Sequence, residues 1–153
     1  RGVNKLYNDA GDGIGTMNLD YLEKILIKFP RNKFLVSCLD YRDQFKLSVL
    51  ARKFQNLKIV GFWWFNNNES IIENLLKQRF ELLGDNFIVQ HSDARIIDQL
   101  VYKWLDFKSI YIKVMVEKYQ KLLSLGYKIK ATDLESKINF HFEEMPKKNI
   151  RLK

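Results

Sequence analysis

The chain has 153 residues, of which 46% are hydrophobic and 14% aromatic, and its 26 basic and 18 acidic residues give a net charge of +8. This composition fits one globular domain and excludes disordered and collagen-like chains. No stretch approaches the roughly 18 apolar residues of a membrane helix, so we expect a soluble protein with no membrane partner. The single cysteine, Cys38, cannot form an internal disulfide, which favours a cytoplasmic location.

The first 29 residues carry a glycine-rich turn, Gly11–Gly15, and a helical pattern with apolar residues from Leu19 to Phe29. The turn follows no strand and lacks the Lys-Ser/Thr ending of a phosphate-binding loop, so we predict no nucleotide site there. The sequence opens at Arg1 without an initiator Met or an apolar signal core. We therefore expect it to begin inside a longer polypeptide.

The excess of positive charge is uneven along the chain. Residues 107–153 hold 11 basic and 5 acidic residues, whereas residues 1–106 hold 15 and 13. Basic residues beside aromatic ones can bind nucleic acid, but these lysines recur between apolar positions, as on the solvated face of an amphipathic helix. The residues concerned are Lys113, Lys118, Lys121 and Lys128. We expect no nucleic-acid partner.

Three apolar runs predict buried strands, near residues 34–39, 57–65 and 86–91. A helical pattern follows each run, so the chain repeats a strand and a helix every two dozen or so residues. Buried strands linked by crossover helices form parallel sheets with right-handed connections. The predicted fold class is α/β, with C-terminal helices after the last strand.

The helical patterns have recognisable ends. Ser70 and Glu73 have the spacing of a capping box, and Gly84 lies where a C-cap belongs. We predict one helix opening after residue 95 and a second over residues 107–125. The first of these two has as apolar positions Ile96, Ile97, Leu100, Val101 and Trp104. Beyond it, the spacing of Leu134, Ile138 and Phe142 predicts a weaker helix before a basic, frayed tail from Lys147 to Lys153.

Polar side chains follow each predicted strand, at the sheet edge where parallel α/β proteins collect functional groups. Asp93 and Arg95 are the best candidates for catalytic residues. A carboxylate can act as a general base, and a guanidinium two residues later can stabilise developing enolate charge. Spacing alone leaves an alternative open, in which Asp93 caps the next helix and Arg95 pairs with Asp93 or Asp98.

Other residues at these edges also have structural interpretations. A lone histidine such as His91 is usually a hydrogen-bonded structural residue, because His141, the second histidine, lies 50 residues away. Trp63 and Trp64 should point to opposite faces of their strand, so we expect at least one indole in the core while the other lines a site. Cys38 is expected to be a small buried hydrophobic residue.

Several motifs resemble uronate isomerase, also called glucuronate isomerase. They are Gly-Phe-Trp-Trp-Phe-Asn-Asn at residues 61–67, Arg-Phe-Glu-Leu-Leu-Gly at 79–84, His-Ser-Asp-Ala-Arg at 91–95 and Leu-Val-Tyr-Lys-Trp at 100–104. The resemblance runs from residue 1 to about residue 125. It implies a (β/α)8 TIM barrel of the amidohydrolase superfamily that interconverts D-glucuronate with D-fructuronate and D-galacturonate with D-tagaturonate.

The resemblance makes the three strands the last three of the barrel, so residues 1–126 form its C-terminal part and residues 127–153 a C-terminal helix and basic tail. It makes Asp93 the proton-transferring base and, in a complete barrel, a ligand of a divalent metal such as zinc. Arg95 would stabilise the cis-enediolate, and Arg1 and Trp64 would contact substrate. The family's His-x-His pair has no counterpart here, so we expect no metal on this segment alone.

The resemblance therefore implies the C-terminal portion of a uronate isomerase, inactive on its own. Its partners would be a uronate sugar and either the missing N-terminal barrel portion or further copies of the chain. The alternative is a non-catalytic α/β interaction module derived from that family, whose sheet edges are covered by the long C-terminal helix or by a partner.

Overall fold

The computed structural model describes residues 15–150. Its sheet pairs β1 (Phe34–Val36) with β2 (Leu57–Ile59) in parallel, and Leu35 lies opposite Lys58. Beyond β2, a parallel bridge joins Val60 to Ile88. The fold is thus α/β with parallel pairing, as predicted. Residue 1 and the turn at residues 11–14 lie outside the described part.

The regular strands are shorter than the predicted runs, because side chains take over the hydrogen bonding where each strand ends. The side-chain amide of Asn66 donates to the carbonyls of Cys38 and Leu39, at 3.0 and 2.6 Å. Gly61 has φ of 49°, and a single 3-10 turn spans Trp64–Asn66. The third run contributes one bridge, in which Ile88 donates to the Ile59 carbonyl at 2.9 Å and accepts from the amide of Gly61 at 2.9 Å.

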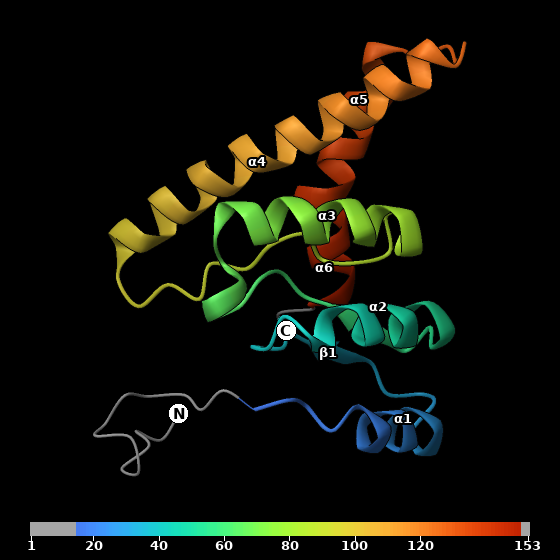
Figure 1. The fold of residues 1–153 in the computed structure, drawn as a ribbon, viewed down its shortest axis with the longest axis vertical. Helices are drawn as coiled ribbons and strands as arrows, with labels where there is room; N and C mark the ends of the chain where they lie inside the picture. Colours follow the sequence, from blue (N-terminus) through green and yellow to red (C-terminus); the bar gives the residue numbers. More distant parts are fainter. Residues whose placement is uncertain (1–14, 151–153) are drawn as a thin grey trace.

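Three helices precede, separate and follow the two strands along the chain (Figure 1). They are α1 (Leu19–Lys28), α2 (Asp43–Lys53) and α3 (Glu69–Leu83). The capping box predicted at Ser70 and Glu73 is wrong. Asn68 caps α3 by accepting from the amide of Ile71, because the helix begins one residue before Ser70. Gly84 closes the helix with φ of 60°, as predicted.

A continuous 28-residue helix, α4 (Ile97–Ser124), replaces the two helices predicted after residue 95. The stretch contains neither Gly nor Pro, so nothing in its backbone chemistry interrupts it. It packs on α3 through one buried face, made of Phe107, Ile110, Tyr111, Val114 and Met115. Of the apolar residues predicted for its first turns, Trp104 packs against the core, but the other four are exposed, including Ile97 at 81%. None of the described helices is long and apolar enough to span a membrane.

The lysines of α4 have more varied surroundings than a solvated face. Lys113 is exposed and its ammonium contacts the Glu73 carboxylate at 2.7 Å. Lys118 is half-buried, 5.0 Å from the centre of the Phe80 ring, and this burial lowers its pKa. Lys128 lies beyond the end of the helix.

The C-terminal segment forms α5 (Ala131–Asn139), a π-helical stretch (Phe140–Glu144) and α6 (Met145–Asn149). Figure 1 shows it running from the far end of α4 past α3 toward the sheet. His141 is fully buried against Phe80 and Phe87, with ring centres 5.4 and 6.4 Å away. The helical order therefore continues through Asn149, past the predicted frayed start at Lys147.

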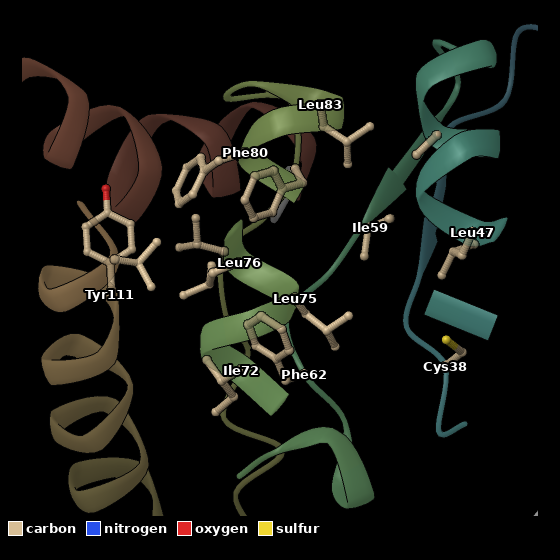
Figure 2. Packing of buried hydrophobic residues seen from close by; sticks show 14 of the residues in the cluster. Cys38, Leu47, Ile59, Phe62, Ile72, Leu75, Leu76, Phe80, Leu83 and Tyr111 are labelled. Carbon is tan, nitrogen blue, oxygen red and sulfur yellow. The ribbon is translucent and has the colours of Figure 1, made fainter. Parts of the chain in front are cut away.

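Buried aliphatic and aromatic side chains join the sheet to the helices. Ile59 of β2 lies between Leu47 of α2 and Leu75 of α3, as Figure 2 shows. All three are at most 2% exposed. Cys38 belongs to the same core at 4% exposure, which confirms its expected role, and burial raises the pKa of its thiol to about 12.

Candidate functional site

Asp93 and Trp63 meet where two neighbouring segments of the sheet end. The indole Nε1 of Trp63 donates a hydrogen bond to Oδ2 of Asp93 at 3.1 Å. Both side chains are half-buried, and Asp93 has φ of 44°. A left-handed backbone is uncommon for a residue other than glycine, and such conformations cluster at functional sites. The structure thus orients the carboxylate of the predicted base through the indole of Trp63.

Arg95 lies beside the second tryptophan. Its guanidinium carbon is 5.9 Å from the centre of the exposed Trp64 ring, within the range of a cation–π contact. Trp64 itself has φ of 43°. The backbone amide of Arg95 donates to the side chain of Gln99 at 2.8 Å. Three of the predicted site residues, Asp93, Arg95 and Trp64, therefore lie in one corner.

The capping interpretation of Asp93 is wrong. The N-cap of α4 is Ile96, which makes no side-chain capping bond, and Asp93 lies three residues before it. The carboxylate of Asp93 accepts from an indole instead.

The expectation that one indole of the pair belongs to the core is also wrong. Trp63 is half-buried and Trp64 is 46% exposed. The alternation of faces that the expectation assumed requires an extended strand. Here the chain leaves the strand at Gly61 and forms a 3-10 turn at Trp64, so both indoles reach the same corner.

His91 contacts the residues that follow both β1 and β2. Its Nε2 lies 3.4 Å from the hydroxyl of Ser37, which follows β1. A Cβ atom at Gly61 would lie 2.4 Å from the backbone nitrogen of His91, so only glycine fits between these segments. The structural interpretation of His91 agrees with these contacts.

The polar residues that follow β1 include a carboxylate that is paired with a neighbouring arginine. Asp40 follows β1 and accepts from Arg42 through both oxygens, the shortest contact being 2.6 Å. These hydrogen bonds lower the pKa of Asp40 to about 2. A carboxylate held this acidic is a poor proton acceptor near neutral pH.

No group of three or more His, Cys, Asp or Glu side chains within residues 15–150 is placed to hold a metal ion. The described residues therefore do not fit a metal site by themselves. The substrate contact predicted at Arg1 lies outside the described residues.

The sequence reasoning missed a buried polar cluster behind this corner. Arg79, Gln44 and Asn66 are each at most 1% exposed. Arg79 had a signal, because it occupies the i+4 position after Leu75 on the buried stripe of α3. Gln44 and Asn66 follow the first two strand runs, but no pattern identified them as buried.

Comparison with solved structures finds similar proteins, among them two uronate isomerases. The first, a uronate isomerase from Bacillus halodurans, superposes with a TM-score of 0.87 and 43% sequence identity over 92% of this chain. The second, a uronate isomerase from Thermotoga maritima, superposes with a TM-score of 0.78 and 23% identity over 92% of this chain. This chain resembles uronate isomerase. The match covers 33% and 31% of the two neighbours, so the chain spans about a third of their length.

The resemblance expected from the motifs at residues 61–67 and 91–95 is thereby confirmed. The partial coverage is consistent with a C-terminal portion of uronate isomerase. The more distant neighbour supports the fold alone. No protein-family model matches the chain, and neither does any curated protein.

Proposed function

We propose that this chain is the C-terminal portion of a uronate isomerase and supplies Asp93 and Arg95 to its active site. The observation that carries this proposal is the corner itself. In a chain 43% identical to a uronate isomerase, a carboxylate oriented by Trp63 and a guanidinium over Trp64 share one edge of a parallel sheet. In this proposal the three strand segments are the last three of a (β/α)8 barrel of the amidohydrolase superfamily.

The proposed reaction moves protons between adjacent carbons and oxygens of the sugar. Asp93 removes the proton from C2 of D-glucuronate, the C1 oxygen gains a proton, and a cis-enediol forms. Returning a proton to C1 while the C2 hydroxyl loses one yields D-fructuronate, and D-galacturonate would give D-tagaturonate in the same way. C1 and C2 are adjacent on one face of the cis-enediol, so one carboxylate can take the proton from C2 and return it to C1. The proton that the C1 oxygen gains is balanced by the proton that the C2 hydroxyl loses.

Arg95 and Trp64 have complementary roles in this reaction. The guanidinium would donate to the oxygens on which negative charge develops, where a fixed cation stabilises the transition state most. Trp64 would hold that guanidinium through its ring face and contact the sugar. Arg1 stays a proposed substrate contact.

A divalent metal such as zinc remains a proposal for the complete barrel, with Asp93 as one ligand of several. The other ligands would have to come from outside residues 15–150, since these do not form a metal group. A lone carboxylate does not retain zinc.

The surface of α4 supports an incomplete barrel over a self-sufficient module. Besides its buried face, the helix carries a series of apolar side chains that are 48–81% exposed, namely Ile97, Val101, Leu105, Ile112, Val116 and Leu123. Leu35 in β1 is also 40% exposed. Large exposed apolar surfaces mark interfaces, so the rest of the barrel or further copies of the chain would cover them.

The test supplies D-glucuronate and follows D-fructuronate formation. A complete polypeptide that carries these residues should turn over, whereas residues 1–153 alone should not. Adding the N-terminal portion as a separate chain should restore activity. Turnover by the 153 residues alone would contradict the proposed dependence on the remainder of the barrel, and an inactive complete polypeptide would contradict the proposed function.

A further inference from the structure

Arg79 is a buried cation held by neutral groups. It is 1% exposed, and its Nη1 donates to the carbonyl of Gly61 at 2.9 Å while its Nη2 donates to Oε1 of Gln44 at 2.8 Å. Its guanidinium carbon lies 4.4 Å from the centre of the Phe62 ring. No carboxylate among residues 15–150 forms an ion pair with it, and its Nε has no hydrogen-bond partner there. Burying a charge on such terms opposes folding.

The hydrogen bonds of Arg79 continue toward the end of the neighbouring strand. Gln44, which accepts from Arg79, donates to the carbonyl of Cys38 at 3.3 Å. Asn66 donates to the same carbonyl at 3.0 Å. One buried network therefore holds both ends of the segment from Gly61 to Asn66. At the first end Arg79 binds the carbonyl of Gly61, and at the other end Asn66 binds the carbonyl of Cys38.

The segment between these two anchors contains both tryptophans of the candidate site. Gly61 and Trp64 have positive φ, and Trp63 donates to Asp93 from between them. Backbone strain persists only where the surroundings fix it. The hydrogen bonds of the buried Arg79 and Asn66 fix the backbone of this segment from its buried side.

We propose that Arg79 is a positioning residue for isomerisation, fixing Gly61 and Phe62 so that the indole of Trp63 orients the Asp93 carboxylate. This proposal rests on the proposed function. An arginine suits the task because its planar fork reaches two acceptors at once while its face stacks on a ring, whereas a lysine offers one compact ammonium.

The kinetic test uses the complete polypeptide that carries this chain, with the variants Arg79→Met, Trp63→Phe and the double variant. Each single variant should lower kcat about 10-fold or more, since small misplacements of a reacting group cost this much, while KM changes less than about threefold. The double variant should lose no more than the worse single variant, because both changes break one chain of contacts. Arg79→Lys should recover part of kcat.

A matched control separates positioning from general loss of stability. Val114→Ala removes buried methyl groups from the α3–α4 interface, away from the corner. It should lower the midpoint of urea unfolding and leave kcat near the wild-type value. Effects of Arg79→Met and Trp63→Phe that multiply in the double variant, or a kcat for Arg79→Met equal to that of the control, would overturn the proposal.

A second measurement needs no turnover. In protein labelled with 5-fluorotryptophan, the 19F resonance of Trp63 is the one lost in Trp63→Phe. Arg79→Met and, more weakly, Arg79→Lys should shift it, whereas Val114→Ala should not. An unshifted Trp63 resonance in both Arg79 variants would overturn the proposal even if kcat falls. An inactive wild-type enzyme contradicts the proposed function instead, and the NMR result then still decides whether Arg79 positions Trp63.

Discussion

The hydroxyl of Tyr111 in α4 lies 2.7 Å from Nδ1 of His141, which enters from the C-terminal helical segment. The opposite nitrogen of the same ring, Nε2, lies 3.0 Å from the Asp85 carboxylate, which also contacts Lys137 at 2.8 Å. These contacts join α4, the turn after α3 and the C-terminal segment. The imidazole of His141 at their centre is fully buried.

Removing the Tyr111 hydroxyl should weaken this junction. Tyr111→Phe leaves a nitrogen of the buried His141 unpaired, and we expect a loss of about 1–3 kcal/mol in the free energy of unfolding. Tyr102→Phe is the control, because Tyr102 lies on the same helix and is 55% exposed. Urea unfolding at equal protein concentration measures both, and equal losses in the two variants would argue against the junction.

The same junction predicts a dependence of stability on pH. Burial is the main cause that lowers the pKa of His141, and Lys137 and Lys118 act in the same direction while Asp85 opposes them. The unfolded chain therefore binds a proton at this histidine more readily than the folded chain does, so stability should fall as pH decreases through the usual histidine range near 6.5. His141→Gln should flatten the change in unfolding free energy between pH 7 and 5. An unchanged slope would contradict this assignment.

Gly61 should be intolerant of any side chain. Gly61→Ala combines a positive φ with a Cβ atom 2.4 Å from the His91 nitrogen. Gly84→Ala is the matched control, since Gly84 also has positive φ but open space around it. Backbone strain should destabilise each variant by about 1–3 kcal/mol, and the additional close approach to His91 should make the loss in urea unfolding larger for Gly61→Ala. Equal losses would show that the close approach to His91 has no cost.

The exposed apolar side chains of α4 should make the isolated chain associate. We expect the 153 residues to form oligomers or heterogeneous assemblies in light scattering, and Leu105→Lys combined with Val116→Lys to reduce them. Asp106→Lys, which changes the charge of the same helix by the same two units at an exposed position on another face, should not. A compact monomer at all concentrations would favour the alternative of a non-catalytic module.

The parallel pairing and the presence of the long helices could be predicted from the spacing of apolar residues. That spacing can be read within a short stretch of sequence, because it reflects which face of an element is buried. The continuity of α4 did not, since apolar residues such as Ile97 and Leu100 indicated a buried start for a separate helix, whereas both are exposed on the uninterrupted helix. In the proposal made above, their hydrophobic pattern belongs to an interface, and periodicity does not say which partner covers it.

The site was predictable in part for a similar reason. Asp93 and Arg95 lie at the end of a strand run, where the general rule for α/β sheets places functional groups. The turn that brings Trp63 to Asp93 depends on Gly61, Asn66 and Arg79, whose contacts link residues far apart in the sequence. Such tertiary hydrogen bonds leave no periodic trace, so the strand prediction through residue 65 continued past the real turn.

The variant Asp93→Asn in the complete polypeptide decides whether Asp93 transfers the proton during isomerisation. An asparagine oxygen can still accept from the Trp63 indole, so the fold should survive while the base is lost. Following D-fructuronate formation from D-glucuronate, we predict a fall in kcat of about 10²–10⁴-fold, while Asp98→Asn, which removes an exposed carboxylate in the first turn of α4, should retain activity. Turnover by Asp93→Asn near the wild-type rate would contradict the account.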